Sequence, residues 1–462
     1  MMDFFFNPDG IAVIGATGNP LKGGYHLLNN IISGYGGEIF PVNPKYQSIQ
    51  GLKCYPDIAS IPRSFDIAVY FIPAEFLPET ITACSQKHVK GIIIESAGFS
   101  EVGDAGRRLQ EEGLHLARNL GIRLWGPNCM GLIDARKRHV FSFMYTDAWK
   151  TLLKAGNVSM IVQSGMLSAG FLMMILDRGG LGINKLCSIG NKCDVNETEL
   201  LEYLISDEQT EVIGLYVESI IDGRRFLELA SSTTKPIILL KGGRSPEGAR
   251  AALSHTASMA GNHTILRGSL RQAGVIEVFD VNEFMDFLRG FSKIRSFSHD
   301  GGTAIITFSG AGGILTADTL HELGLRLARF SGNTLNAMKR VYPPWMDPSN
   351  PADIWPAIEA NGINTVYDAV AEAIMRDPDV DSLIIHIFTS WMESPLFASL
   401  STLKDELGKP VIAWLTGVGE NLLSFRASLE EMGIPVFDEM SRGVHILSGL
   451  KHHFRRKGHA EY

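Results

Sequence analysis

Short, almost wholly apolar runs alternate along the chain with longer segments in which apolar residues recur at helical spacing. Such runs are Ile11 to Gly15, Ile67 to Ile72, Gly91 to Glu95, Val158 to Val162, Val212 to Val217, Thr303 to Phe308, Ser382 to Phe388 and Pro410 to Leu415. A short run without polar alternation is typical of a strand buried on both faces of a parallel sheet. The pattern therefore predicts an α/β protein built from doubly wound parallel sheets.

The same pattern divides the chain into three α/β units. A chain of 462 residues has the length of about three domains. A basic, aromatic-rich connector around residues 136–156 and a polar run around residues 296–302 interrupt the alternation. We therefore expect domains at residues 1–140, 151–297 and 298–462.

Composition and charge restrict the classes of function. The formal net charge of -8 gives no broad basic surface for a nucleic acid. The five cysteines show neither a disulfide pattern nor zinc-site spacing. No run approaches the roughly 18 apolar residues that span a membrane, and Met1 to Phe6 lacks the form of a signal peptide. We expect a cytoplasmic protein that binds no nucleic acid, no membrane and no metal.

The first candidate site follows the first predicted strand, where the chain reads Gly15, Ala16, Thr17, Gly18, Asn19 and Pro20. A glycine turn between a buried strand and a helix presents backbone N–H groups to a phosphate. The next strand ends at Lys45, where NAD enzymes carry Asp or Glu. This lysine favours coenzyme A (CoA), with its 3′-phosphate, over NAD. The alternative is a tight turn without a ligand.

A second candidate is His255, which lies among small and hydroxyl-bearing residues from Ser254 to Gly261. Small neighbours leave space for a phosphoryl group, and a neutral imidazole nitrogen is a nucleophile towards phosphorus. From the residues alone, an ordinary surface or core histidine is the simpler interpretation. Glu218 ends the run Val212 to Val217, where a carboxylate could hold the other ring nitrogen or could simply face solvent.

Two more strand ends lead into helices through small residues, and together they form a candidate phosphate site. One reads Gln163, Ser164 and Gly165, and the other reads Gly310, Ala311, Gly312 and Gly313. Each helix start would offer free N–H groups and the positive end of the helix dipole to an anion. Two ordinary turns are the alternative. Neither is followed by the Gly-Lys-Ser/Thr of a P-loop, so we do not expect this chain to bind ATP directly.

Taken together, these motifs resemble those of the NDP-forming acyl-CoA synthetases, relatives of succinyl-CoA synthetase. The resemblance covers essentially the whole chain. Its motifs, in order, are the Gly15 turn, Asn43-Pro44-Lys45, Gly126-Pro127-Asn128, Gln163-Ser164-Gly165, the run Ser188 to Val195 and Ser254-His255-Thr256. It implies a Rossmann-like CoA-binding domain followed by two flavodoxin-like domains.

The resemblance also implies a reaction and its residues. Acyl-CoA, ADP and phosphate would be interconverted with a carboxylic acid, CoA and ATP through an acyl phosphate and a phosphohistidine. His255 would carry the phosphoryl group, Glu218 would support it, and the two helix starts would flank it. The residues expected to bind CoA are Gly15 to Pro20, Lys45, Pro73, Glu95 and Asn128. A separate ATP-grasp beta subunit would bind ADP or ATP with Mg²⁺, in a hetero-oligomer.

This sequence departs from the family pattern at two places. Ala257 stands where relatives commonly have glycine, and Phe308-Ser309-Gly310-Ala311 replaces a common Asn-Ala-Gly-Gly-Pro, which leaves the detailed phosphate contacts open. The sequence does not indicate the acyl group. Two other functions remain: a CoA-binding regulatory or scaffold protein without turnover, and an NAD-linked dehydrogenase, against which Lys45 argues.

Overall fold

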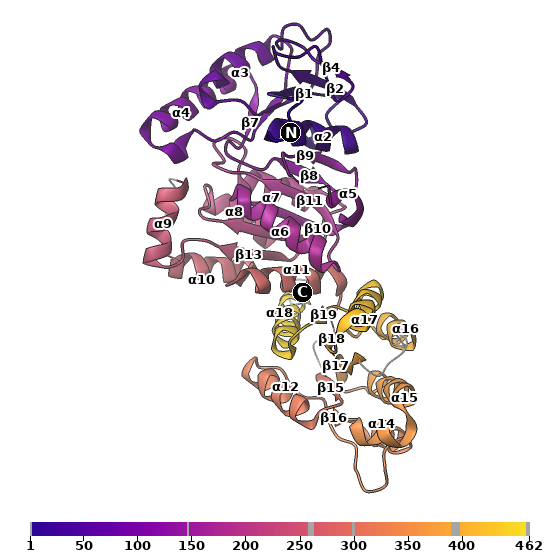
Figure 1. Ribbon diagram of the computed structural model, residues 1–462. Helices are drawn as coiled ribbons and strands as arrows, with labels where there is room; N and C mark the ends of the chain where they lie inside the picture. The colour runs from indigo at the N-terminus through magenta and orange to yellow at the C-terminus, as the bar shows by residue number, and fades with distance from the viewer. Residues whose placement is uncertain (1, 146, 257–262, 298–300, 390–397, 459–462) are drawn as a thin grey trace. The chain divides into compact units, whose positions relative to one another are not determined.

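The chain folds into two compact units, Met1–Asp280 and Val281–Tyr462, each described here by itself. The computed structural model describes residues 2–145, 147–256, 263–297, 301–389 and 398–458 (Figure 1). Within these residues lie two five-stranded sheets, one seven-stranded sheet and a small hairpin. The α/β class with parallel sheets is confirmed.

The first sheet of unit 1 is fully parallel. Its strands, in spatial order, are β2 (Glu38–Val42), β1 (Gly10–Ile14), β5 (Ile67–Tyr70), β6 (Gly91–Ile94) and β7 (Arg123–Trp125). Next to it lie the short α1 (Asp3–Phe6) and the antiparallel hairpin of β3 (Ser48–Ile49) and β4 (Leu52–Lys53).

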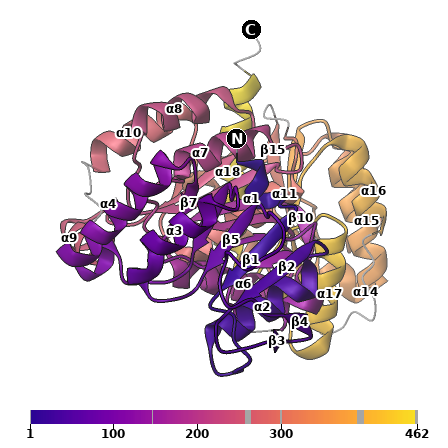
Figure 2. The same ribbon diagram turned by 90° about the horizontal axis from the view of Figure 1, so that it is seen from above.

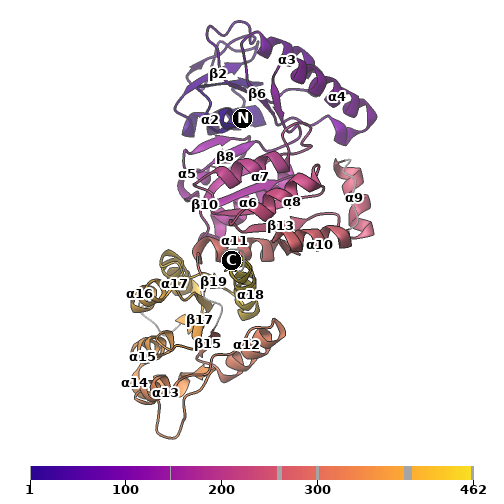
Figure 3. The same cartoon turned by 180° about the vertical axis from the view of Figure 1, so that it is seen from behind.

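Helices cover both faces of this sheet because its strands are apolar on both sides. On one face, Leu27 and Ile31 of α2 (Gly23–Gly34) join the core of Ile11 and Val13. The other face is covered by α3 (Leu77–Ser85) and α4 (Asp104–Asn119), preceded by the 3-10 turns η1 (Ala74–Phe76) and η2 (Ser100–Val102) (Figure 3). The result is a doubly wound layer.

The second sheet of unit 1 extends a parallel core with two antiparallel strands. Its strands, in spatial order, are β14 (Ile276–Val278), β13 (Ile237–Lys241), β12 (Val212–Val217), β10 (Ala155–Val162), β11 (Ile183–Ser188), β8 (Leu132–Asp134) and β9 (His139–Phe141). Its helices are α5 (Trp149–Leu152), α6 (Gly165–Arg178), α7 (Glu197–Ser206), α8 (Gly223–Ser232), α9 (Pro246–Thr256) and α10 (His263–Ala273). The segment between the two parallel sheets therefore contains β8 and β9, and β8 pairs with β11 of the second sheet.

The two sheets of unit 1 share one hydrophobic core. The cluster that contains Ile11 and Leu27 continues through Trp125 and Phe141 to Ile161 and beyond. The segment after β11 lies along the end of β7, where the backbone N–H of Val195 donates to Leu124 O at 3.1 Å and that of Cys193 to Gly126 O at 2.9 Å. The motif at residues 188–195 thus joins the two sheets.

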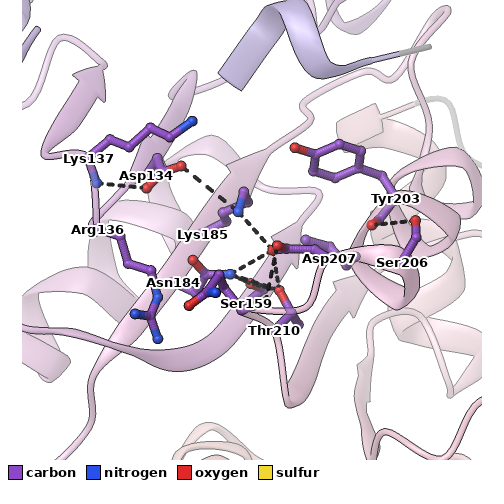
Figure 4. Close-up of polar contacts among 12 residues, drawn as sticks. Asp134, Arg136, Lys137, Ser159, Asn184, Lys185, Tyr203, Ser206, Asp207 and Thr210 are labelled. Carbon is purple, nitrogen blue, oxygen red and sulfur yellow. Dashed lines mark hydrogen bonds and ion pairs between the residues drawn. The ribbon is translucent and has the colours of Figure 1, made fainter. Parts of the chain in front are cut away.

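A buried polar cluster fixes β8 to the second sheet (Figure 4). Lys185 Nζ on β11 lies 2.8 Å from Asp207 Oδ2 and 3.9 Å from Asp134 Oδ2 on β8. Asn184 donates to Asp207 at 2.7 Å and to Thr210 at 2.9 Å. Burial alone would raise the pKa of Asp207, but hydrogen bonds from Lys185 and Thr210 outweigh it and lower the pKa below its ordinary value.

Unit 2 contains a third, fully parallel sheet. Its strands, in spatial order, are β16 (Ala352–Asp353), β15 (Gly302–Thr307), β17 (Val380–Phe388), β18 (Val411–Thr416) and β19 (Val436–Phe437). Its helices are α11 (Val281–Lys293), α12 (Gly310–Glu322), α13 (Gly332–Lys339), α14 (Trp355–Asn361), α15 (Ile363–Met375), α16 (Ala398–Leu407), α17 (Gly419–Glu431) and α18 (Met440–Gly458). Figure 2 shows α14, α15 and α16 in one row, and α11 packs on α18.

All three sheets repeat one strand order. Counted along the chain, the parallel strands of each sheet lie in the order 2-1-3-4-5. The order reverses beside β1, β10 and β15, and ligands of open α/β sheets bind outside the carboxyl ends of strands at such points. The three predicted glycine-containing turns directly follow these three strands, so each occupies the topological position of a ligand site.

Candidate functional site

A cavity of about 500 Å³ lies within unit 1, at the carboxyl ends of β5 and β6 and the start of α6. Apolar side chains that include Phe71, Met130 and Phe143 form part of its wall. It is also lined by residues that the sequence predicted for two different ligands: Pro73, Glu95 and Asn128 for CoA, and Gln163, Ser164 and Gly165 for phosphate. The fold therefore brings six predicted site residues to one cavity.

Glu95 is the carboxylate of this cavity. It directly follows β6 and is 4% exposed. Its Oε2 accepts a hydrogen bond from the backbone N–H of Phe143 at 3.2 Å, whereas its Oε1 has no hydrogen-bond partner among the described residues. Burial raises the pKa of Glu95 well above its usual range, against the smaller opposite effect of the Phe143 N–H.

Asn128 is held in the cavity wall by both sheets. Its backbone, at φ 56°, donates to Ser96 O at 3.0 Å, and its Nδ2 donates to Asn191 Oδ1 at 3.4 Å. Asn191 in turn donates to Glu101 at 2.6 Å and to Gln110 at 3.0 Å. The sequence analysis did not single out Asn191 as a site residue, although it belongs to the motif at residues 188–195.

A second cavity of about 320 Å³ lies beside the first, at the carboxyl ends of β1 and β2. Gly15, Asn43 and Pro44 line it, and Ile72 lines both cavities. The next residue, Lys45, is exposed and does not belong to the described wall. Two predicted CoA-binding segments therefore lie at one cavity, with Lys45 adjacent to it in the chain.

The Gly15 turn differs from the predicted direct passage into a helix. Helix α2 begins at Gly23, and residues 16–22 form a loop. Within the loop, Asn19 N–H donates to Thr17 Oγ1 at 3.2 Å and Asn43 Nδ2 donates to Ala16 O at 2.7 Å. A Cβ on Gly24 would lie 2.3 Å from Gly15 O, so this unpredicted glycine brings the helix start back to the turn.

The start of α6 has the predicted form of an anion-facing helix end. Ser164 is the N-cap, and its hydroxyl accepts from Leu167 N–H at 3.3 Å, which leaves earlier N–H groups of the helix free for a ligand. Gln163 is engaged elsewhere: its Oε1 accepts from the backbone N–H of Glu218 at 2.7 Å. Gln163 thus connects the helix start to Glu218.

Glu218 follows β12 and is 5% exposed. The hydroxyl of Tyr216 donates to its Oε1 at 3.4 Å, and Lys241 Nζ donates to its backbone oxygen at 2.6 Å. Burial lowers the pKa of Lys241 to about 8, against the opposite effect of Glu218. Burial also lowers the pKa of Lys192, which pairs with the fully buried Glu197 at 2.7 Å. The sequence analysis did not predict Lys241 or Lys192 as site residues.

His255 lies in the last turn of α9, and its side chain is outside the described residues, as are Ala257 to Gly261. The turn between β13 and α9 packs closely on both sides. A Cβ added to Gly243 would lie 3.5 Å from Cβ of Ala252 on α9, and one added to Gly242 would lie 3.2 Å from Cγ of Glu218. Helix α9 also contacts η2 of the first sheet. The pairing of His255 with Glu218 stays a prediction.

The other predicted helix start belongs to unit 2. Ser309 is the N-cap of α12, with its hydroxyl accepting from Gly312 N–H at 3.3 Å. A Cβ on Gly310 would lie 3.0 Å from Asp353 Oδ2, and one on Gly313 would lie 2.8 Å from Pro351. Close packing therefore accounts for part of the glycine run, and a carboxylate already faces the helix start. The joint phosphate site of Gly310 to Gly313 with Gly165 stays a prediction.

Among the described residues, no helix has both the length and the apolar character that a bilayer-spanning segment requires. The same residues contain no group of three or more His, Cys, Asp or Glu side chains that could hold a metal ion.

Three family models match successive parts of the chain. The CoA binding domain matches residues 9–135, the succinyl-CoA ligase like flavodoxin domain matches residues 155–291, and the ligase-CoA domain matches residues 303–459. These matches confirm the predicted Rossmann-like and flavodoxin-like fold class. The predicted boundaries at 1–140, 151–297 and 298–462 stay predictions.

The chain is also similar to proteins of archaea. It is 35% identical to the ADP-forming acetate–CoA ligase II of Archaeoglobus fulgidus, over 99% of this chain and 67% of that protein. It is 36% identical to the alpha subunit of ADP-forming acetate–CoA ligase II of Pyrococcus furiosus, over 95% and 94% of the two chains. A dinucleotide-forming acetyl-coenzyme A synthetase 1 of Candidatus Korarchaeum cryptofilum, solved with phosphate and ADP, covers 99% of both chains with 29% identity and a TM-score of 0.87. On this similarity over nearly its full length, the chain belongs to the family of ADP-forming acyl-CoA synthetases, as its motifs predicted.

Proposed function

We propose that this chain is the CoA-binding subunit that forms acyl phosphate and carries the phosphohistidine in an ADP-forming acyl-CoA synthetase. The observation that carries the proposal is the 500 Å³ cavity, because it gathers predicted CoA residues such as Asn128 and the capped start of α6. A thioester carbonyl and a phosphate can meet only where both ligands are bound.

In the first step, an oxygen of hydrogen phosphate attacks the thioester carbon. The C–S bond breaks, its electron pair leaves with sulfur, and the proton of hydrogen phosphate ends on the CoA thiol. In the second step, a neutral imidazole nitrogen of His255 attacks the phosphorus of the acyl phosphate. The bond from phosphorus to the acyl oxygen breaks and releases the carboxylate, while Glu218 accepts a hydrogen bond from the other ring nitrogen. The phosphoryl group then passes to ADP, which gives ATP.

The two neighbouring cavities suggest how CoA lies on the first sheet. The nucleotide end would occupy the cavity at Gly15 and Pro44, with Lys45 at its rim near the 3′-phosphate. The pantetheine arm would pass Ile72, which lines both cavities, and place the thioester near Glu95 and Asn128. The order β2, β1, β5, β6 thus runs from the nucleotide to the acyl group.

We further propose that ADP or ATP, with Mg²⁺, is bound by an ATP-grasp beta subunit in a hetero-oligomer. The relative from Pyrococcus furiosus is named an alpha subunit, which supports a separate partner. A cytoplasmic location is supported by the five cysteines, all of which are free thiols. The names of the relatives favour an enzyme over the regulatory or scaffold alternative.

The test is phosphorylation of the full chain together with its ATP-grasp partner and ATP labelled in the γ-phosphate. Wild type should acquire acid-labile label, and His255→Ala should not. His263, which pairs with Glu277 at 2.7 Å, offers a matched control: His263→Ala should be labelled like wild type. Label that persists on His255→Ala would exclude His255 as the phosphoryl carrier, and labelling without turnover of any acyl-CoA would favour the regulatory alternative.

A further inference from the structure

A second, much smaller void adjoins the 500 Å³ cavity within unit 1, and Met130 borders both spaces. The void has a volume of about 10 Å³, and its wall includes Ile133, Met144, Leu172 and Leu186. Among the described residues that line the two spaces, Met130 is the only one common to both. Its side chain therefore separates the cavity from the void.

The void continues the cavity along the same two segments of the chain. On α6, Gly165 lines the cavity, and Leu172 lines the void about two turns later. After β9, Phe143 lines the cavity, and the next residue, Met144, lines the void. The void therefore lies further along α6 than the cavity, beyond Met130.

Met130 is held against the start of α6. Its backbone N–H donates to the buried hydroxyl of Ser188 at 2.9 Å, and the residue is 8% exposed. A Cβ added to Gly165 would lie 3.5 Å from Met130 Cγ, which is ordinary van der Waals contact. A thioether side chain is flexible and apolar, so it can close one end of an apolar pocket without leaving a polar group unpaired.

The geometry of the proposed reaction directs the acyl group towards Met130. Phosphate would lie at the start of α6, and the thioester carbon must come within about 3–3.5 Å of its attacking oxygen. The CoA arm would reach this carbon past Ile72, which lines both the 500 Å³ cavity and the nucleotide cavity. The sulfur then lies on the Ile72 side of the carbonyl carbon, so the acyl chain leaves on the other side, where Met130 packs at the helix start.

The walls of both spaces suit an uncharged acyl group. No described Lys, Arg or His lines the cavity or the void. A second carboxylate on the acyl chain would therefore lose its hydration without gaining a cation, which is costly. The wall of the void is apolar apart from three serines and a glycine. The surroundings of Met130 thus favour the acyl group of a monocarboxylic acid.

Resting on the proposed function, we infer that the Met130 side chain forms the end wall of the acyl pocket and determines the length of the uncharged acyl group that is accepted. The void of about 10 Å³ is at the lower limit for one water molecule, roughly 10–15 Å³. No acyl carbon enters it while Met130 is in place. Truncation of Met130 would join the void to the cavity and lengthen the pocket. Met130 therefore selects the substrate and takes no part in bond making.

The first test measures kcat/KM of the full chain with its ATP-grasp partner for acetyl-, butyryl-, hexanoyl- and octanoyl-CoA. Met130→Ala should raise kcat/KM for the longer acyl groups relative to acetyl-CoA by at least about 10-fold, the lower end of the effect of one methylene in an apolar pocket. Met130→Val removes less of the side chain, so it should shift the ratio in the same direction by less, and it decides the matter if Met130→Ala does not fold. An unchanged ratio in the folded variants would overturn the inference.

Met144 provides the matched control, because it is a buried methionine that lines only the void. Met144→Ala enlarges the void but leaves Met130 as the partition. This variant should lower the urea midpoint of unfolding without changing the ratio of kcat/KM between long and short acyl groups. A shift as large as that of Met130→Ala would show that loosened packing, and not loss of an end wall, changes the specificity.

A second readout does not depend on turnover. The thioethers S-ethyl-CoA and S-octyl-CoA have no carbonyl group, so phosphate cannot attack them. Calorimetric titration should show that the affinity for S-octyl-CoA, relative to that for S-ethyl-CoA, is higher in Met130→Ala than in wild type. The same relative affinity in the two proteins would contradict a role of Met130 in acyl length.

Succinyl-CoA tests the charge of the acyl group. Wild type and Met130→Ala should both convert it far more slowly than butyryl-CoA, because neither pocket wall offers a cation. Comparable rates for the two thioesters would refute the restriction to uncharged acyl groups. Wild type that converts none of the acyl-CoAs would refute the proposed function itself, whereas normal wild-type turnover with an unchanged length profile in the variants would refute only the role of Met130.

Discussion

Gln163 accepts a hydrogen bond at 2.7 Å from the backbone N–H of Glu218, and this bond joins the start of α6 to the end of β12. Both residues are buried, with exposures of 1% and 5%. The sequence assigned Gln163 to the phosphate site and Glu218 to the support of His255. The hydrogen bond fixes these two residues to each other, so the position of Glu218 depends on Gln163.

Gln163→Met should weaken both the fold and the phosphorylation of His255. The buried N–H of Glu218 loses its partner, which costs about 1–3 kcal/mol. Tyr216→Phe is the control, because it removes only the longer 3.4 Å bond to the Glu218 carboxylate. Urea unfolding and the rate of labelling from ATP measure the two effects. An unfolding free energy of Gln163→Met equal to that of wild type would contradict the coupling.

Lys192→Met should strongly destabilise unit 1, because it leaves the fully buried Glu197 as an uncompensated charge. Loss of one partner of a buried pair costs about 3–5 kcal/mol. Adding Glu197→Gln should restore part of this stability, since the second charge is then also removed. Chemical denaturation of the single and double variants measures the difference.

The exposed pair of Arg63 and Glu38 provides the control for this prediction. Its side chains are 67% and 48% exposed, so Arg63→Met should cost at most about 1 kcal/mol. A double variant of Lys192 and Glu197 no more stable than Lys192→Met alone would show that the charge of Glu197 is not the cause.

Gly15→Ala should abolish CoA binding. Gly15 has φ +93°, and an added Cβ would lie 2.4 Å from Phe71 O, so the backbone of the turn must move. Gly51→Ala tests the dihedral effect alone, because Gly51 has φ +82° and nothing within 4 Å of the added Cβ. Calorimetric titration with CoA should detect binding to Gly51→Ala and none to Gly15→Ala. Normal affinity of Gly15→Ala would exclude the turn from the site.

The stability of unit 2 should fall in acid because of His386. The ring stacks on Trp414 at 3.5 Å and is hydrogen-bonded to Thr307 and Thr416. Burial lowers its pKa to about 3, below the unfolded value of about 6.5. Between these two pKa values, His386 binds a proton in the unfolded chain but not in the folded chain. The free energy of unfolding therefore decreases as pH falls below about 6.5.

Between pH 6.5 and pH 5 this loss amounts to about 2 kcal/mol. His386→Gln cannot titrate, so its unfolding free energy should change less over the same interval, although it is less stable at neutral pH. Thermal melts of both proteins across this range measure the difference. Parallel pH profiles would show that His386 does not govern the acid response.

The sequence predicted the strands well because central strands of parallel sheets are apolar on both faces. Each predicted run is a strand, with ends within three residues of the prediction. Ser164 could be predicted as part of a helix start because a serine cap has a local cause in its own hydroxyl. Local chemistry thus determined most of the fold and the helix-start part of the site.

The remaining features depend on contacts between distant segments. β8 and β9 have three residues each, too few for a periodic signal, and they are strands because β11 pairs with β8. Asn191 reaches the cavity through Asn128 and Glu101, far away in the chain. Glu95 packs against Gly131 and accepts a hydrogen bond from the Phe143 N–H, and both residues lie far along the chain from it. None of these relationships has a signature in the neighbouring sequence.

The pairing of β8 with β11 limits how this protein can be divided into expression fragments. A fragment that starts at residue 151 would lose β8 and β9, leave the N–H and C=O groups of β11 as a bare edge, and remove Asp134 from Lys185. Bare sheet edges promote self-association. A fragment of residues 1–140 would carry β8 and only part of β9, without the rest of their sheet. A fragment meant to retain both cavities should therefore comprise residues 1–280.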